Sequence, residues 1–128
     1  MMKSILAATA ALLVSACAGA DRAPMMEQGY KPGALAVAAI GRSDWSAAEA
    51  LLEARNGASA GDPARLINLG KVYMETGRPG EALSAWRLAL ASEHHFMVET
   101  RDGRVVSTDV LARRAISRYE RGVRTASQ

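Results

Sequence analysis

Residues 62–92 read DPARLINLGKVYMETGRPGEALSAWRLALAS, and this stretch decides the fold. Asp62 can accept amide hydrogens from a first helical turn, and Pro63 fits the first helical position, where no amide donor is needed. Gly77 is suited to the left-handed residue that follows a helix. The sequence therefore predicts a helix from Pro63 to about Thr76, closed by Gly77.

A second helix is predicted to start at Pro79 and to run to about Ser92. Two helices joined by so short a corner form a helical hairpin. Small residues at Gly70 and Ala82 let the two helices approach closely, while Tyr73 and Trp86 fill the space beside them.

The spacing in this hairpin resembles the tetratricopeptide repeat, a 34-residue unit written W-x2-L-G-x2-Y, then A-x3-F, then P. The matching positions are Leu69, Gly70 and Tyr73 in the first helix and Ala82, Trp86 and Ala89 in the second. Leu66 stands in place of the tryptophan and His94 in place of the proline. The clear repeat spans 63–96.

A weaker copy is predicted over 33–62, because Ala48 precedes Ala82 by one 34-residue period. Its first helix, Ala34 to Ile40, is short, as expected for the degenerate end of a solenoid. The fold class is therefore mainly α, with tetratricopeptide-like helical hairpins in a domain over 33–124.

The chain after His95 is predicted to form a β-hairpin over 96–107. A two-residue Asp-Gly turn gives poor cross-strand pairs, whereas a three-residue loop with Gly103 left-handed places Val98 opposite Val106. A last helix over 108–122 follows and closes the open end of the repeat. Its expected buried stripe is Ala112, Ile116, Tyr119 and Val123.

The first residues, 1–16, have the features of a secretory signal. Lys3 precedes an apolar run from Ser4 to Ala16, which is shorter than the roughly 20 residues that cross a bilayer. The run ends in LVSAC at Cys17, which resembles the lipobox of bacterial lipoproteins. The resemblance implies an acylated Cys17, a membrane anchor and, with Ala18 next, the periplasmic face of the outer membrane.

An alternative is ordinary signal cleavage, which would release a soluble periplasmic protein. In the anchored form residues 17–32, which contain Pro24, Gly29 and Pro32, are predicted to be a tether between membrane and domain.

Composition narrows the chemistry. A formal net charge of +3 over 128 residues does not indicate a nucleic-acid binder, and one cysteine allows neither an internal disulfide nor a cysteine-based metal site. No phosphate-binding loop, G-x-S-x-G or H-E-x-x-H motif is present. The adjacent His94 and His95 are interpreted as a polar helix end, not as metal ligands. We expect no enzyme activity, catalytic residue, metal or cofactor.

The tetratricopeptide resemblance implies a peptide-binding face on the first helix, with an asparagine that bonds the ligand backbone. The residues on this face are Ala64, Ile67, Asn68, Lys71, Met74 and Glu75. The expected function is a scaffold that binds a protein or peptide partner at the cell envelope. The alternatives for this face are an ordinary exposed surface or a contact with the C-terminal hairpin.

A second candidate surface is the arginine-rich last helix, which could contact anionic lipid or another polyanion. Its arginines are Arg113, Arg114, Arg118, Arg121 and Arg124, with Arg101 and Arg104 on the nearby hairpin. The alternative is a solvated face that spreads around much of the helix and pairs partly with Glu120.

Overall fold

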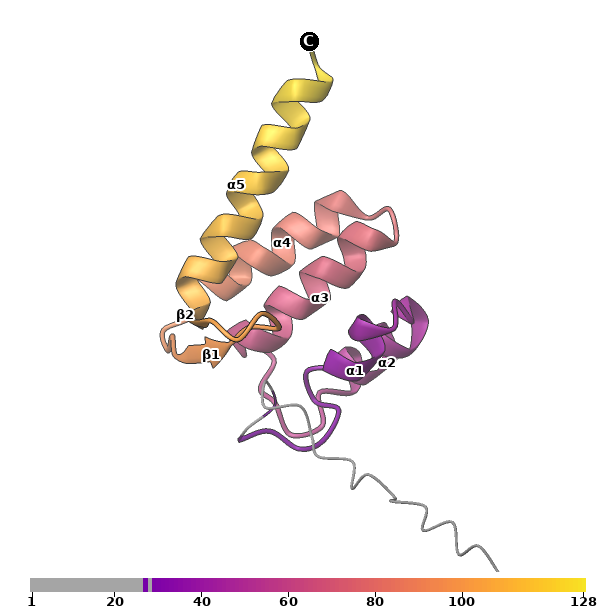
Figure 1. Ribbon diagram of the computed structural model, residues 1–128, viewed down its shortest axis with the longest axis vertical. Helices are drawn as coiled ribbons and strands as arrows, with labels where there is room; N and C mark the ends of the chain where they lie inside the picture. The colour runs from indigo at the N-terminus through magenta and orange to yellow at the C-terminus, as the bar shows by residue number, and fades with distance from the viewer. Residues whose placement is uncertain (1–26, 28) are drawn as a thin grey trace, which may run out of the picture.

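The computed structural model describes residue 27 and residues 29–128. The predicted signal segment 1–16, Cys17 and the first part of the tether lie outside these residues. Within them the chain is mainly helical with one small antiparallel sheet, as predicted (Figure 1). The elements are α1 (Val37–Gly41), α2 (Trp45–Ala54), α3 (Pro63–Glu75), α4 (Pro79–Leu90), β1 (Met97–Glu99), β2 (Val105–Ser107) and α5 (Thr108–Ala126).

The α3–α4 hairpin has the predicted capping residue and the predicted glycine at its corner. Asp62 Oδ1 accepts a hydrogen bond from the Arg65 amide at 2.9 Å, which caps α3. Gly77 has a φ of 76°, the left-handed conformation that ends the helix at little steric cost for glycine. Helix α4 ends at Leu90, two residues before the predicted Ser92.

Small residues bring these two helices together. Ala82 and Ala89 are fully buried, and Trp86 is only 6 % exposed. The Trp86 indole lies on Gly70, and its Nε1 donates a hydrogen bond to the Ile67 carbonyl at 3.2 Å. Tyr73, expected in the core, is only partly buried and packs at the edge of the cluster shared with α2.

The α1–α2 pair packs on the other side of α3, and the shared core consists of Ala36, Ala39, Ala48, Leu52, Leu69 and Val72. Helix α1 begins at Val37 and not at Ala34, because residues 32–35 form a turn and Ala36 is left-handed with a φ of 54°. The weak first helix is therefore shorter than the sequence suggested.

Two arginines link the hairpins. The guanidinium of buried Arg65 donates to the carbonyls of Leu52 at 3.0 Å and Ala60 at 2.7 Å, which satisfies the end of α2 and the loop after it. Burial lowers the pKa of Arg65. Arg78, at the start of α4, donates to Glu49 of α2 at 2.6 Å.

Residues Glu27 and 29–32 belong to the folded body, so the tether prediction is wrong over its last part. Glu27 is 4 % exposed, and its carboxylate accepts amide hydrogens from Gly33 at 3.0 Å, Leu35 at 3.2 Å and Val37 at 3.4 Å. The Tyr30 hydroxyl donates to Asp62 Oδ2 at 2.9 Å. The glycines and prolines here shape a packed turn.

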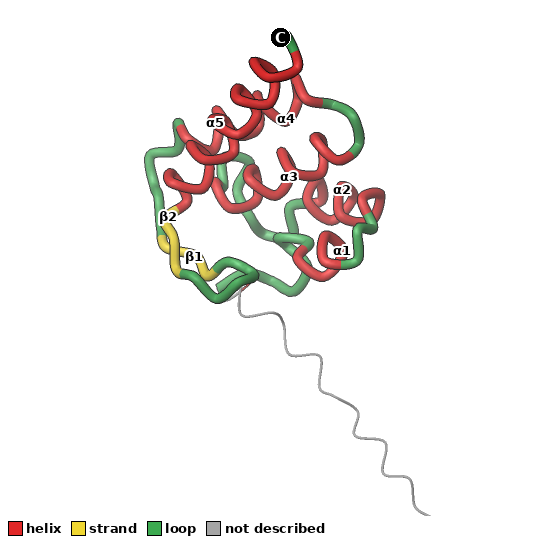
Figure 2. Tube along the Cα trace, turned by 45° about the horizontal axis from the view of Figure 1, so that its top comes forward, coloured by secondary structure: helices red, strands yellow, loops and turns green. Residues whose placement is uncertain are grey.

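The two strands of the β-hairpin are drawn in yellow in Figure 2. They have the predicted register, with Val98 opposite Val106 and Gly103 left-handed at a φ of 78°. Helix α5 follows directly and closes the α3–α4 hairpin, since Ala112 packs with Leu66 and Ala89. It continues to Ala126, past the predicted end.

The predicted buried stripe of α5 is correct only near its start. Ala112 is fully buried, Ile116 and Tyr119 are partly buried, and Val123 is 47 % exposed. Figure 1 shows the reason, because the second half of α5 extends beyond α4 and away from the other helices that the structure describes.

Candidate functional site

The predicted peptide-binding face of α3 divides into two halves. At the start of the helix, Ala64 is 7 % exposed, and Ile67 packs against the cluster formed by Leu66, Ala89 and Ala112. These two side chains serve the fold and offer little surface to a partner.

Asn68, expected to bond a ligand backbone, already bonds the backbone of its own chain. Its side-chain amide donates to the Leu35 carbonyl at 2.8 Å. Leu35 is 3 % exposed and lies in the turn that precedes α1. The alternative of an intramolecular contact therefore describes Asn68, although the partner is the N-terminal segment and not the C-terminal hairpin.

The second half of the face is open. Lys71 Nζ lies 3.3 Å from Glu75 Oε1, with side chains 50 % and 44 % exposed, and Met74 between them is partly buried. Lys71 also lies over the ring of Trp45 at 5.7 Å from the centroid. We call Lys71, Met74, Glu75 and Trp45 the α3 row. It combines a cation, an anion and two apolar groups within one small area.

The second candidate surface is the arginine face of α5, which comprises Arg113, Arg114, Arg118, Arg121 and Arg124. At 3.6 residues per turn these five positions fall within about 140° of the helix circumference, opposite the stripe that contains Ala112 and Tyr119. The arginines are thus more segregated than the sequence reading assumed.

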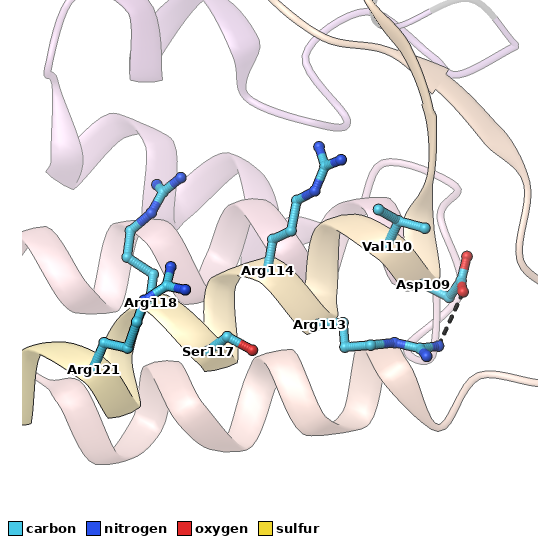
Figure 3. Close-up of a pocket in the computed structure, with 7 residues that line it drawn as sticks. All are labelled: Asp109, Val110, Arg113, Arg114, Ser117, Arg118 and Arg121. Atoms are coloured by element: carbon cyan, nitrogen blue, oxygen red, sulfur yellow. Dashed lines mark hydrogen bonds and ion pairs between the residues drawn. The ribbon is translucent and has the colours of Figure 1, made fainter.

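A shallow hollow of about 520 Å³ lies along this face. Its lining residues are Asp109, Val110, Arg113, Arg114, Ser117, Arg118 and Arg121 (Figure 3). Figure 3 shows Arg113 turned to Asp109 at one end, with an N–O distance of 3.1 Å, while Arg118 and Arg121 lie at the other end. The Ser107 hydroxyl also donates to Asp109, and these contacts lower the pKa of the Asp109 carboxyl.

The hairpin arginines are not part of that hollow. Arg104 Nε donates to Asp102 Oδ2 at 2.6 Å on the hairpin loop. A hydrogen bond from the Thr100 hydroxyl, followed by the one from Arg104, lowers the pKa of Asp102. Arg104 therefore stabilises its own loop, and neither Arg101 nor Arg104 lines the hollow on α5.

The histidine pair lies in the connection between α4 and β1, four and five residues past Leu90, and not at the predicted helix end. His95 Nε2 lies 3.2 Å from the Leu90 carbonyl, and Nδ1 lies 3.0 Å from Thr108 Oγ1. Because a carbonyl can only accept, Nε2 carries a proton in this arrangement. His95 thus joins the end of α4 to the start of α5. Across residues 27 and 29–128, no three His, Cys, Asp or Glu side chains are grouped to hold a metal ion.

Sequence reasoning missed three polar residues that organise these surfaces, namely Glu27, Tyr30 and Arg65. Glu27 and Tyr30 stood in a segment interpreted as a tether. Arg65 lies between Ala64 and Leu66 in the first helix of the clear repeat. An arginine inside the apolar stretch of the first helix is the one signal that could have indicated it.

A scan against models of known protein families, a search of curated proteins and a search of solved structures each found no match for this chain. Within the described part of the chain, no helix is both long enough and apolar enough to cross a bilayer.

Proposed function

We propose that this chain is a non-enzymatic docking module of the bacterial cell envelope, built from tetratricopeptide-like repeats and binding a partner protein through the α3 row. The observation that carries the proposal is that the two helical hairpins repeat with the period of that family. Stacked repeats of this kind present a continuous surface for polypeptide partners. A repeat fold indicates only a general class of function, so the exposed surface must itself support binding.

The period appears in the boundaries of the helices. Helix α1 ends at Gly41 and α3 ends at Glu75, 34 positions later, and α2 begins at Trp45 and α4 at Pro79, again 34 positions later. The left-handed residues of the two corners, Ser43 and Gly77, have the same separation, with φ values of 58° and 76°.

The same period appears in the packing. Ala48 and Ala82 are both fully buried, and one turn later Leu52 and Trp86 are 0 % and 6 % exposed. Equivalent positions therefore carry equivalent packing roles in both hairpins. This correspondence supports the repeat assignment even though the first helix of the weak unit lacks the residue types of the repeat pattern.

The α3 row favours a polypeptide partner. Lys71 and Glu75 can form hydrogen bonds with main-chain or charged groups of a partner. Met74 supplies a flexible apolar side chain, and Trp45 supplies a flat aromatic ring. We leave Asn68 out of the proposed face because its side-chain amide already donates to the Leu35 carbonyl. The binding face is therefore shorter than the six residues first considered.

Photo-crosslinking in cells tests this proposal. A photoreactive amino acid placed at Lys71 or Met74 is expected to capture one discrete protein. The control is Leu88 of α4, which is 61 % exposed and does not belong to the row. Equal capture from Leu88, or no capture from either row position, would show that the row is not the docking face.

The anchor is tested separately. If Cys17 is acylated, the Cys17→Ser chain should leave the membrane fraction and detergent phase, and mass spectrometry should find a lipid-modified N-terminal cysteine in the native protein. A mature N-terminus at Gly19 or Asp21 without lipid would instead support the soluble periplasmic form.

A further inference from the structure

The arginine face of α5 carries a charge arrangement that costs the helix stability. Arg114, Arg118 and Arg121 follow one another at intervals of four and three residues. On a helix such neighbours lie side by side, and like charges there repel. An ordinary solvated face interleaves acids with bases, but the positions three and four residues away from Arg118 are Arg114, Ala115, Arg121 and Gly122.

The described residues do not neutralise these three arginines. The ion pair of α5 joins Arg113 to Asp109, and Glu120 forms none with the arginines around it in the part of the chain that the structure describes. A row of uncompensated guanidinium groups that lies along a hollow is suited to multivalent carboxylate recognition.

We propose that the arginine face binds an acidic polypeptide segment of a partner protein. Charge complementarity defines the occupant, because carboxylates spaced along a peptide can each meet one of Arg114, Arg118 and Arg121. The hollow also presents Asp109 and Ser117 beside the arginines. A polypeptide carries both amide donors and carboxylates and so complements that mixed lining. A uniformly anionic lipid surface would instead be repelled by the Asp109 carboxylate at one end of the hollow.

The geometry of α5 also argues against a lipid surface. The apolar groups of the exposed half, Tyr119 and Val123, lie on the opposite side of the helix from the arginines. A flat bilayer could therefore engage only one of the two sides at a time. This second surface is separate from the α3 row, so its test can fail without affecting the docking proposal.

The experiment uses the purified full-length chain and labelled poly-L-glutamate, with fluorescence anisotropy as the readout. The test variant combines Arg114→Gln, Arg118→Gln and Arg121→Gln. The control combines Arg42→Gln, Arg87→Gln and Arg101→Gln, which removes the same charge from exposed positions elsewhere. We expect the test variant to bind about tenfold more weakly, which is the contribution expected of three exposed ion pairs. The control should lose less than about twofold in affinity.

Two further measurements complete the test. The test variant should unfold at the same or a slightly higher urea concentration, because the repulsion along α5 is removed. Vesicles rich in anionic lipid should show no binding that depends on these arginines. Equal losses in both triple variants, a loss of stability in the test variant, or arginine-dependent binding to vesicles in place of poly-L-glutamate would overturn the proposal.

Discussion

The indole ring of Trp86 lies so close to the backbone of Gly70 that a Cβ atom on Gly70 would be 2.3 Å from its Nε1. The contact joins α3 to α4 at the centre of the clear repeat. Since real Cβ atoms do not approach other atoms so closely, the glycine is required by the ring that covers it.

Gly70→Ala should therefore destabilise the protein, although alanine favours a helix more than glycine does. We expect a loss of about 1–3 kcal/mol, as found for overpacked cores, measured by urea unfolding. Gly80→Ala in α4 is the matched control, because nothing lies within 4 Å of its Cβ position. The control should be neutral or gain up to about 1 kcal/mol. A Gly70→Ala protein as stable as the control would contradict the packing described for Trp86.

Asn68→Ala should reduce stability more than Lys71→Ala does. The first substitution leaves the Leu35 carbonyl without its donor, which should cost about 1 kcal/mol. The second removes an exposed side chain and should change the free energy of unfolding by less than about 0.5 kcal/mol. Thermal melts of the two single variants distinguish these effects. If only the Lys71 variant loses stability, the roles assigned to the two halves of the face are reversed.

Glu27→Gln should loosen the turn before α1. Gln keeps one acceptor oxygen but places an amide donor against backbone amides that are themselves donors. Hydrogen bonds to a charged group contribute about 1.5–3 kcal/mol, so a loss near 2 kcal/mol is expected in urea unfolding. Amide hydrogen exchange at Gly33 and Leu35 should accelerate. Glu93→Gln, at an exposed position, serves as the control and should change neither quantity.

Tyr30 should make the protein sensitive to alkaline conditions. Burial raises the pKa of its phenol, and the hydrogen bond to Asp62 and the charge of Asp62 raise it further. In the unfolded chain the phenol ionises near pH 10, while in the folded chain it stays protonated. Its stabilising contribution is therefore complete below about pH 10 and is lost as the pH rises beyond that value. Tyr30→Phe should show a flatter decline in melting temperature above about pH 10 than the parent chain.

Local signals in the sequence predicted the hairpin well, because its boundaries depend on residues adjacent in the chain. Asp62 caps α3, Gly77 ends it, and Gly103 sets the register that pairs Val98 with Val106. Each of these effects acts within a few residues. The four-residue spacing of Ala82 and Trp86 was equally informative, because it places both side chains on the same face of the helix.

Contacts between distant segments were not predictable in the same way. Glu27 and Tyr30 looked like tether residues, because only the folded chain brings Asp62 and the amides of the turn to them. Asn68 was placed on the correct helix face, but the carbonyl that accepts its hydrogen bond belongs to Leu35, 33 positions earlier in the chain. Val123 fits the apolar period of α5, yet it is 47 % exposed.

The length of α5 beyond the body bears on how tightly its arginines can hold a partner. Residues 120–128 are exposed at every position, so the last turns of the helix rest on their own backbone hydrogen bonds. Short helices without tertiary support are marginal in water, and their amides exchange at rates close to those of an open chain. Arg121 and Arg124 would then spend part of their time outside helical geometry. A bound acidic segment would have to order these turns, so association would carry an entropic cost and release would be fast.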